Sequence, residues 1–395
     1  MKKMFVVGAS ILQLPAIEKA KEYGYEVAVA DYNPKAMGIA YADKYYDVST
    51  IDEKGVCEAA KDFGADGIMT LATDMPMRSV AYTCNKLGLV GISYDTAIKA
   101  TDKAEMIRAF EENGVAHPSY YVLEHGKTLD RLPENLEYPI ISKPVDNAGS
   151  HGVQIIRSEQ ELQSAIKYSR ENGRSGDIII EEYMEGPEVS VETLSIDGVC
   201  HVIQITDKLT TGAPNFVETG HSQPTALPQE TVEKIKELAI AANKAVGITD
   251  GPSHTEIIVT KHGPKIVELG ARLGGDCIAT HLVPLSTGVD MVGACIEIAL
   301  GGKPDIGHKI KKGSAIRYFS QHKGVIKEIT GLEEAKNTDG IKQISVVHGV
   351  SEKISDITDS GSRMGFVIAQ AETPEKAAEI CEEALSKIKV TIEDV

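Results

Sequence analysis

Apolar runs typical of strands alternate with amphipathic helical patterns through the first part of the chain. The expected strands span residues 4–8, 26–31, 67–71 and 89–92, and the expected helices span residues 11–23, 53–63 and 76–87. This alternation is typical of an open α/β unit with a parallel sheet. Ligands of such units bind beyond the carboxyl ends of the strands, which draws attention to the segments after Val7, Ala30 and Thr70.

The first strand and helix carry only part of a dinucleotide-binding pattern. Gly8 ends the first strand and Asp31 ends the second, but the later glycines of GxGxxG are absent. Without those glycines a pyrophosphate cannot approach the backbone closely, so NAD(P) binding is not favoured. The chain also lacks the GxxxxGK[ST] pattern of a P-loop.

Charge and composition narrow the function classes further. The chain has 395 residues, with 41 Lys and Arg against 58 Asp and Glu, which gives a formal net charge of −17. This acidic excess repels nucleic acid and anionic lipid. The six cysteines form no CxxC pair, which indicates reduced thiols, and no apolar stretch approaches the ~18 residues of a membrane span. We therefore expect a soluble, cytoplasmic protein that binds neither nucleic acid nor membrane.

A lysine stands in the first turn of a helix predicted to begin near Thr101. Asp102 and Glu105 have the spacing of a capping pair. A cation at Lys103 opposes the helix macrodipole by about 0.3–1 kcal/mol. Either an anion compensates this cost, or the side chain is simply exposed to solvent.

A predicted strand at 138–143 delivers Lys143 to a loop of small residues that runs from Asp146 to Val153. Gly149, Ser150 and Gly152 would allow backbone N–H groups to converge on one point, as they do in phosphate-binding loops. The alternative is an ordinary hairpin with a glycine-rich turn.

The next apolar strand, from Asp177 to Met184, runs into a Gly-Pro break. A purine base needs backbone donors and acceptors beside an apolar slot, and a strand that leads into such a break offers both. Glu188, just past the break, could accept hydrogen bonds from sugar hydroxyls. A plain hinge with solvated acids is the alternative interpretation.

The strongest local chemistry lies in a predicted hairpin whose turn begins at Lys261. Period-two alternation places His254 with Glu256 on one face of the first strand, and Glu268 with Arg272 on one face of the second. Two facing carboxylates repel unless a cation lies between them, and oxygen ligands at this separation suit Mg²⁺ shared with phosphate. The planar fork of Arg272 matches carboxylate or phosphate. A surface hairpin would not explain acids inside otherwise apolar runs.

The segment from Thr206 to Pro224 is rich in Gly, Pro and Thr, and we expect it to be a long loop between strands. Loops of this length are uncommon unless they are functional, so the segment is interpreted as the wall or lid of an acceptor pocket. Lys208 and His221 are candidate substrate contacts within it, as His254 is on the hairpin, although a histidine such as His221 is often structural.

Together, and in this order, these residues resemble the ATP-grasp superfamily over nearly the whole chain. The sequence from Glu268 to Gly275, Glu-Leu-Gly-Ala-Arg-Leu-Gly-Gly, is similar to the branch that contains L-amino-acid ligases and relatives of phosphoribosylglycinamide synthetases. The resemblance implies an α/β and α+β chain with an open parallel α/β domain, an ATP-grasp fold and a small β-rich closing domain. The implied domains span 1–97, 98–305 (lid subdomain about 115–185, larger subdomain about 186–305) and 306–395.

The resemblance also implies a role for each candidate residue. Lys103 and Lys143 would hold the α- and β-phosphates of ATP, and the loop with Gly149, Ser150 and Gly152 would fold over them. Adenine would bind to the backbone of Glu182, Tyr183 and Met184, and Glu188 would accept a hydrogen bond from the ribose. Mg²⁺ or Mn²⁺ would be bound by Glu256 and Glu268. Many members have Glu-x-Asn where this chain has Glu268-Leu-Gly270, so the usual third ligand is missing. Water or bidentate Glu268 could fill that place.

The implied activity is that of an ATP-dependent carboxylate–amine ligase. A carboxylate reacts with the γ-phosphate to give an acyl phosphate, which an amine attacks to form an amide, with release of ADP and phosphate. Lys143, Glu268 and Arg272 would be catalytic, with Arg272 holding the acyl phosphate or a substrate carboxylate. The expected partners are small-molecule carboxylates and amines, and the C-terminal domain is a candidate homodimer face. A bicarbonate-activating carboxylase or carbamoyl-phosphate-type enzyme, and an ATP-binding protein without turnover, remain the alternatives.

Overall fold

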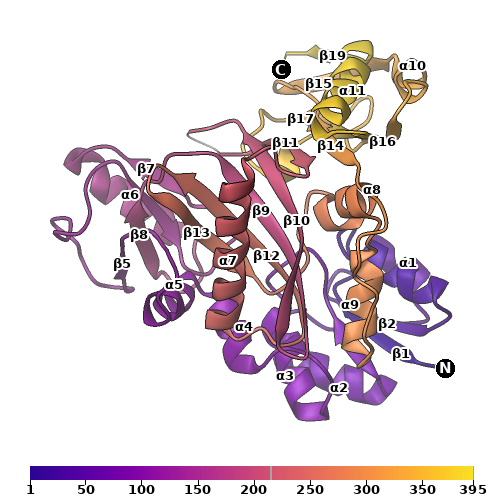
Figure 1. Cartoon of the computed structure of the whole chain (residues 1–395), viewed down its shortest axis with the longest axis horizontal. Helices are drawn as coiled ribbons and strands as arrows, with labels where there is room; N and C mark the ends of the chain where they lie inside the picture. Colours follow the sequence, from indigo (N-terminus) through magenta and orange to yellow (C-terminus); the bar gives the residue numbers. More distant parts are fainter. Residues whose placement is uncertain (214–215, 395) are drawn as a thin grey trace.

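The computed structural model describes residues 1–213 and 216–394. Its N-terminal unit is a four-stranded parallel sheet, drawn in indigo to violet in Figure 1. In spatial order its strands are β3 (Lys44–Asp47), β2 (Glu26–Asp31), β1 (Lys3–Val7) and β4 (Gly67–Met69). The helices of this unit are α1 (Leu14–Glu22), α2 (Glu53–Phe63), α3 (Met77–Leu87) and α4 (Tyr94–Thr101), with a 3-10 turn at Met37–Tyr41. The open parallel α/β prediction is therefore confirmed.

Helix α2 shows why the sequence located some elements accurately. The carboxylate of Asp52 accepts a hydrogen bond from the backbone N–H of Gly55 at the first turn, and Gly64 ends the helix in the left-handed conformation. Both are common termination devices. The predicted range 53–63 coincides with the helix because its two ends are set by local residues.

The strand predicted at 89–92 is wrong, because these residues form a tight connection between α3 and α4. Gly88 ends α3 with a φ of 69°. Gly91 lies so close to Cys84 that a Cβ there would be 2.7 Å from Sγ. Ser93 then caps α4 by accepting from the N–H of Thr96. Ile92 of this segment packs with Met77 of α3 and Ala97 of α4, whereas Val90 is exposed.

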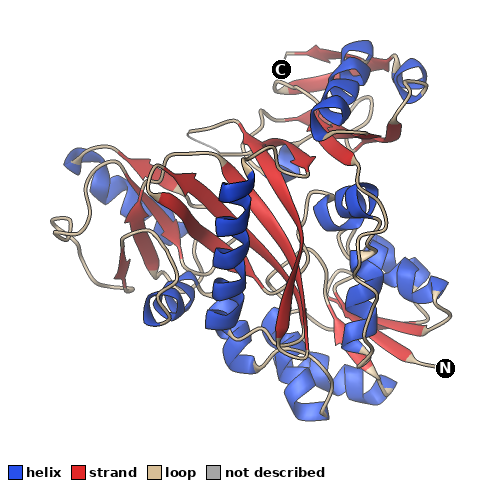
Figure 2. Ribbon diagram, viewed as in Figure 1, coloured by secondary structure: helices blue, strands red, loops and turns tan. Residues whose placement is uncertain are grey.

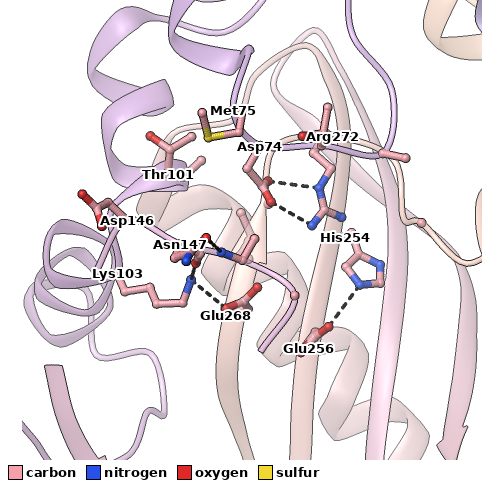
Figure 3. Close-up of a pocket in the computed structure, with 18 of the residues that line it drawn as sticks. Asp74, Met75, Thr101, Lys103, Asp146, Asn147, His254, Glu256, Glu268 and Arg272 are labelled. Atoms are coloured by element: carbon pink, nitrogen blue, oxygen red, sulfur yellow. Dashed lines mark hydrogen bonds and ion pairs between the residues drawn. The ribbon is translucent and has the colours of Figure 1, made fainter. Parts of the chain in front are cut away.

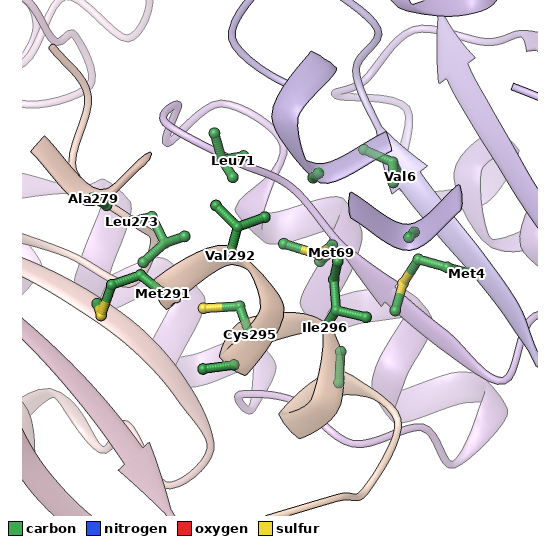
Figure 4. Close-up of a cluster of buried hydrophobic side chains, with 14 of the residues drawn as sticks. Met4, Val6, Met69, Leu71, Leu273, Ala279, Met291, Val292, Cys295 and Ile296 are labelled. Carbon is green, nitrogen blue, oxygen red and sulfur yellow. The ribbon is translucent and has the colours of Figure 1, made fainter. Parts of the chain in front are cut away.

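A helix from much later in the chain completes the N-terminal core (Figure 4). Helix α9 (Met291–Ala299) packs its Val292 and Ile296 into the same buried cluster as Met4 and Met69 of the parallel sheet. The N-terminal unit and the rest of the protein thereby share one buried apolar cluster, and such burial is the dominant favourable term in folding.

A second, antiparallel sheet forms the unit at the left of Figure 1. In spatial order its strands are β5 (Tyr120–Leu123), β8 (Ile178–Glu182), β6 (Ile140–Pro144) and β7 (Gln154–Ile156). Helices α5 (Lys103–Glu112) and α6 (Glu159–Glu171) accompany it. Strands β6 and β7 flank the predicted small-residue loop, as expected for a strand-loop-strand unit.

The largest sheet has eight strands and is antiparallel (Figure 2). In spatial order its strands are β13 (Gly263–Gly270), β12 (Gly251–Thr260), β9 (Glu188–Ile196), β10 (Val199–Thr210), β11 (Glu218–Gln223), β14 (Gly313–Tyr318), β18 (Gly365–Ala371) and β16 (Ile341–Val346). Helix α7 (Gln229–Val246) covers one face, and a π-helical turn at Ile278–Leu282 leads into α8 (Val283–Thr287). The predicted hairpin is confirmed as β12 and β13.

The C-terminal part combines strands of the large sheet with a small sheet of its own. That sheet contains β17 (Lys353–Ile354), β15 (Gly324–Thr330) and β19 (Lys389–Glu393), and helices α10 (Leu332–Lys336) and α11 (Pro374–Lys387) pack nearby. Because β14, β18 and β16 continue the large sheet across residue 306, the domain division at 98 and 306 stays a prediction.

Among the described residues no single helix is long and apolar enough to cross a membrane, although the helical segments 278–287 and 291–299, which meet at a bend of 112°, pass that test of length and composition as a pair.

Candidate active site

A cavity of about 500 Å³ lies where the three regions of the chain meet. The loop after β4, the start of α5, the loop after β6 and strands β12 and β13 all contribute to its wall (Figure 3). The candidate residues that reach the wall are Lys103, Gly149, Lys208, His221, His254, Glu256, Glu268 and Arg272. Residues that the sequence placed in four separate motifs are thus brought together.

The two candidate metal carboxylates face each other across the hairpin. Glu256 and Glu268 occupy directly opposite positions of β12 and β13, where side chains of the two strands lie about 4.5–5.5 Å apart at Cβ. Each is held by a lysine, since Lys103 Nζ lies 3.0 Å from Glu268 and Lys208 Nζ lies 3.0 Å from Glu256. Facing acids therefore have the cationic partners that their proximity requires.

Lys208 is the centre of a buried charge cluster. Its ammonium, with only 5% of the side chain exposed, lies 2.6 Å from Glu188 and 3.8 Å from Glu218 in addition to Glu256. Burial opposes its charge, but the three carboxylates raise the pKa of Lys208 well above its ordinary value. Burial also raises the pKa of Glu188, while the lysine keeps the pKa of Glu256 well below its usual range despite burial. Sequence reasoning missed Glu218, which lies three positions before His221 in the segment that was predicted to be a loop.

The long loop predicted from Thr206 to Pro224 is wrong for most of its length. Its first part belongs to β10 and its last part to β11, and Lys208 pairs directly with His221 across these strands. Lys208, Glu218 and His221 of these strands line the charged cavity, and their polar side chains hid the strand pattern. Pro214 and Asn215 of this segment lie outside the described residues.

His254 joins the cavity to a fully buried acid. Its Nδ1 is hydrogen-bonded to Glu192 and its Nε2 lies 3.5 Å from Glu256. Burial would lower the pKa of His254, but Glu192 and Glu256 outweigh it and raise that pKa to about 9. Glu192 was missed, although an acid inside the apolar strand β9 is the same signal that revealed Glu256.

The high pKa of His254 predicts a stability change at alkaline pH. The folded pKa of about 9 exceeds the ordinary value of 6.5, so the stabilisation is complete below pH 6.5 and is lost as pH rises through about 9. At about 1.4 kcal/mol per pKa unit it is worth at most about 3.5 kcal/mol. Denaturant unfolding across this range should show the loss in the wild type and in His262→Gln, an exposed control, but not in His254→Gln. Identical profiles for all three proteins would contradict the assignment.

Arg272 is held by an acid of the N-terminal unit. Its Nε and Nη2 each donate to Asp74 at 3.0 Å, a bidentate pair that spans the two regions (Figure 3). Burial opposes the charge, but Asp74 raises the pKa of Arg272. Gly270 makes room for this pair, because a Cβ there would lie 2.6 Å from Asp74 Oδ1. Asp74 follows β4, so of the three strand-end segments predicted to bind ligands, the one after Thr70 reaches the cavity.

The other two strand ends are filled by protein groups. Asp31 accepts from the backbone N–H of Ala9 at 2.8 Å, and the Gln13 amide donates to Leu71 O at 2.7 Å. Neither Ala9 nor Asp31 lines the cavity.

The small-residue loop reaches the cavity with only part of its length. Lys103 Nζ donates to Asn147 O at 2.8 Å, and Gly149 lies on the wall with a left-handed φ of 66°. Ser150 and Gly152 do not line the cavity. A Cβ at Gly152 would lie 2.7 Å from the ring of Pro144, so this glycine serves packing against the strand.

The predicted adenine and ribose residues lie outside the cavity wall. Lys143 is buried and pairs with Glu181 at 2.7 Å, and Glu182 pairs with Lys265 at 2.7 Å. Tyr183 and Met184 follow β8 and are half-buried. Glu188 is joined to the cavity through Lys208. Lys143 is also linked to it indirectly, since Glu181 lies close enough to act on the charge of Lys103.

The C-terminal region closes the end of the cavity near His221. His221 Nε2 lies 3.2 Å from Asp276, and Arg363 binds the same carboxylate at 2.6 and 2.8 Å. Ser360 lines the cavity and donates to Glu218 at 2.9 Å. The C-terminal residues were missed because no motif marks them.

Two family descriptions match the chain, and together they define its class. Residues 136–280 match the ATP-grasp domain and residues 317–393 match the L-amino acid ligase C-terminal domain 2. The chain therefore combines an ATP-grasp domain with an L-amino acid ligase C-terminal domain. It is an enzyme that joins a carboxylate to an amine at the expense of ATP.

Its relatives support the same placement. The alanine–anticapsin ligase of Bacillus subtilis (strain 168) is 26% identical over 75% of this chain and 66% of its own length, so this chain spans about two thirds of that relative. The L-amino acid ligase of Bacillus licheniformis has the same fold, with a TM-score of 0.86 at 24% identity over 100% of this chain and 99% of that one. Phosphoribosylglycinamide synthetase from Anaerococcus prevotii gives a TM-score of 0.81 at 24% identity over 99% and 100%.

Proposed function

We propose that Glu256 and Glu268 hold Mg²⁺, or Mn²⁺ in its place, between the protein and the triphosphate of ATP. The donor set fits, because two carboxylates on opposite positions of β12 and β13 offer oxygen ligands only. No group of three His, Cys, Asp or Glu side chains in the described part of the chain is set for a metal ion. Phosphate oxygens and water would therefore complete the coordination, as is usual for Mg²⁺. When bound, the ion neutralises charge on the phosphates and so favours attack by an anion.

The remaining nucleotide contacts are proposed from the order of the motifs along the chain. Lys103 and Lys143 bind the α- and β-phosphates, and the loop with Gly149, Ser150 and Gly152 closes over them. The backbone of Glu182, Tyr183 and Met184 binds adenine, and Glu188 accepts from the ribose. What supports this order is that Lys103 already contacts both the loop and Glu268.

The substrate carboxylate attacks the γ-phosphorus of ATP, the bond to the β,γ-bridging oxygen breaks, and ADP leaves. The amine then attacks the carbonyl carbon of the acyl phosphate, inorganic phosphate leaves, and the ammonium proton is lost to give the amide. Arg272 stabilises the acyl phosphate or the substrate carboxylate, since it lines the cavity and carries a positive charge. Lys208, His221 and His254 line the acceptor end, and we assign L-amino acids as the substrates.

The observation that carries this proposal is the convergence of Glu256, Glu268, Lys103 and the small-residue loop on one cavity. Phosphate release should be measured with Mg²⁺-ATP and pairs of proteinogenic L-amino acids, with mass spectrometry of the product. A dipeptide product with equimolar ADP supports the proposal. Stimulation by bicarbonate alone would point instead to a carboxylase, and the absence of stimulation by any acceptor would point to an ATP-binding protein without turnover.

Replacing Lys143 by alanine should weaken ATP binding by at least about 10-fold, because the buried ammonium that we propose as a phosphate ligand is lost. Equilibrium binding of ATP to the variant measures the effect. Lys167→Ala is the matched control, since Lys167 is exposed on α6 of the same unit. Equal ATP affinity for Lys143→Ala and the wild type would remove the phosphate role of Lys143.

A further inference from the structure

The N-terminus of α3 lies on the cavity wall without a capping side chain. Pro76 at the N-cap contributes no side-chain hydrogen bond, and the first turn contains no acid. The first N–H groups of a helix have no intrahelical partner and carry the positive end of the macrodipole. Arg78 and Ser79 in this turn both line the cavity.

The charge of Arg78 is unusual for this position and for this cavity. Among the described residues, Lys103, Lys208, His221, His254 and Arg272 on the wall each have a carboxylate within 4.0 Å. Of the basic residues described on the wall, Arg78 and the exposed Arg174 lack such a partner. A cation in the first turn of a helix is unfavourable unless an anion lies beside it.

The guanidinium of Arg78 is already oriented. Its Nε donates to Thr101 Oγ1 at 2.8 Å, and that hydroxyl donates to Ala97 O at 2.7 Å. The terminal N–H groups of Arg78 therefore stay available as a planar fork, the arrangement that suits a carboxylate.

Ser79 provides a second and independent indication. It is fully buried, and its hydroxyl has no hydrogen-bond partner in the protein. Buried polar atoms are nearly always paired, so an unpaired one on a cavity wall indicates a missing ligand.

We propose that Arg78, Ser79 and the N-terminus of α3 bind the free carboxylate of the amine-donating amino acid. This subsite rests on the proposed ligase function. It adjoins the reacting centre, because Asp74 just before α3 holds Arg272, and Thr101 lies two residues before Lys103. The carboxylate of the acyl donor is consumed in the reaction, whereas that of the amine donor persists and needs a cation of its own.

The test compares an amine donor with its carboxamide, which lacks the charge. With an active amino-acid pair and saturating ATP, KM for the carboxamide should exceed KM for the free acid by about 10- to 100-fold in the wild type. Arg78→Gln should abolish this preference, and Ser79→Ala should reduce it by about 3- to 10-fold with an unchanged or higher melting temperature. Lys86→Gln, which removes a charge from the exposed far end of α3, should behave as the wild type.

Equal KM values for acid and carboxamide in the wild type, or an undiminished preference in both variants, would overturn the subsite. Inorganic phosphate that competes with the amine donor in the wild type but not in Arg78→Gln would also overturn it, in favour of a phosphate site. If no amino-acid pair turns over, the assignment of amino-acid substrates fails separately. Calorimetric titration of L-amino acids and their carboxamides into the ADP-bound protein then compares the affinities of the acid and the carboxamide. If neither compound binds, the proposed carboxylate subsite is overturned.

Discussion

Replacing Glu268 by glutamine is expected to lower kcat for ATP-dependent ligation by at least about 1000-fold. Glutamine keeps the shape of the side chain but removes the charge that would bind Mg²⁺ beside Glu256. It also removes the anionic partner that lies 3.0 Å from Lys103. The fold should survive, because Glu268 is partly exposed to the cavity and Lys103 keeps its bond to Asn147 O.

Metal binding separates this expectation from a general loss of structure. Mn²⁺ affinity in the presence of ATP, followed by electron paramagnetic resonance, should fall in Glu268→Gln while the melting temperature changes little. Glu237→Gln is the control, because Glu237 is exposed on α7 away from the cavity. Unchanged turnover or unchanged Mn²⁺ affinity in Glu268→Gln would remove the metal assignment.

The charges of the cavity suggest how ligands enter it. Lys103 and Glu268 pair with each other, as do Lys208 and Glu256. A triphosphate with a divalent cation carries both signs of charge, so it can replace each internal pair by a pair with the ligand. The exchange avoids leaving a buried charge unpaired, which would cost several kcal/mol in a site of this kind.

Local pattern was sufficient to predict the hairpin and its facing acids. The turn at Lys261 and period-two alternation fix which side chains of β12 and β13 share a face, and the register places Glu256 opposite Glu268. A cation in the first turn of α5 is unfavourable unless an anion lies nearby, and Glu268 is such an anion beside Lys103. The hairpin needed only residues close together in sequence, whereas the identity of the anion beside Lys103 came only from the structure.

The remaining contacts could not be predicted because they join distant segments. Asp74 and Arg272 are 198 positions apart, and Arg363 and Asp276 are 87 apart. No periodicity records such pairings, which arise only when the N-terminal and C-terminal regions pack on the large sheet. The end of β10 and strand β11 were mistaken for a loop for a related reason: Lys208, Glu218 and His221 line a cavity that exists only in the tertiary fold.

Replacing Arg272 by lysine is expected to lower kcat by about 100- to 1000-fold while ATP affinity changes little. Lysine retains a positive charge but loses the planar fork that binds Asp74 through two hydrogen bonds. A donor aimed at charge that develops in the transition state is typically worth ~3–4 kcal/mol. Steady-state kinetics and ATP binding together measure the two effects. A lower ATP affinity with unchanged kcat would instead place Arg272 in ground-state nucleotide binding.

The geometry around Gly270 allows a second, independent test of the role of Arg272. An alanine at 270 would place its Cβ 2.6 Å from Asp74 Oδ1 and 3.2 Å from Arg272 Cζ, so the pair must shift although both of its charges remain. If Arg272 acts through its orientation, Gly270→Ala and Asp74→Asn should each lower kcat in the same direction as Arg272→Lys, by about 10-fold or more. Combining Asp74→Asn with Arg272→Lys should then cost less than the sum of the two, because residues that act as one unit are not additive. Full additivity would mean that Asp74 and Arg272 contribute separately, and that the N-terminal unit does not position Arg272 for the proposed reaction.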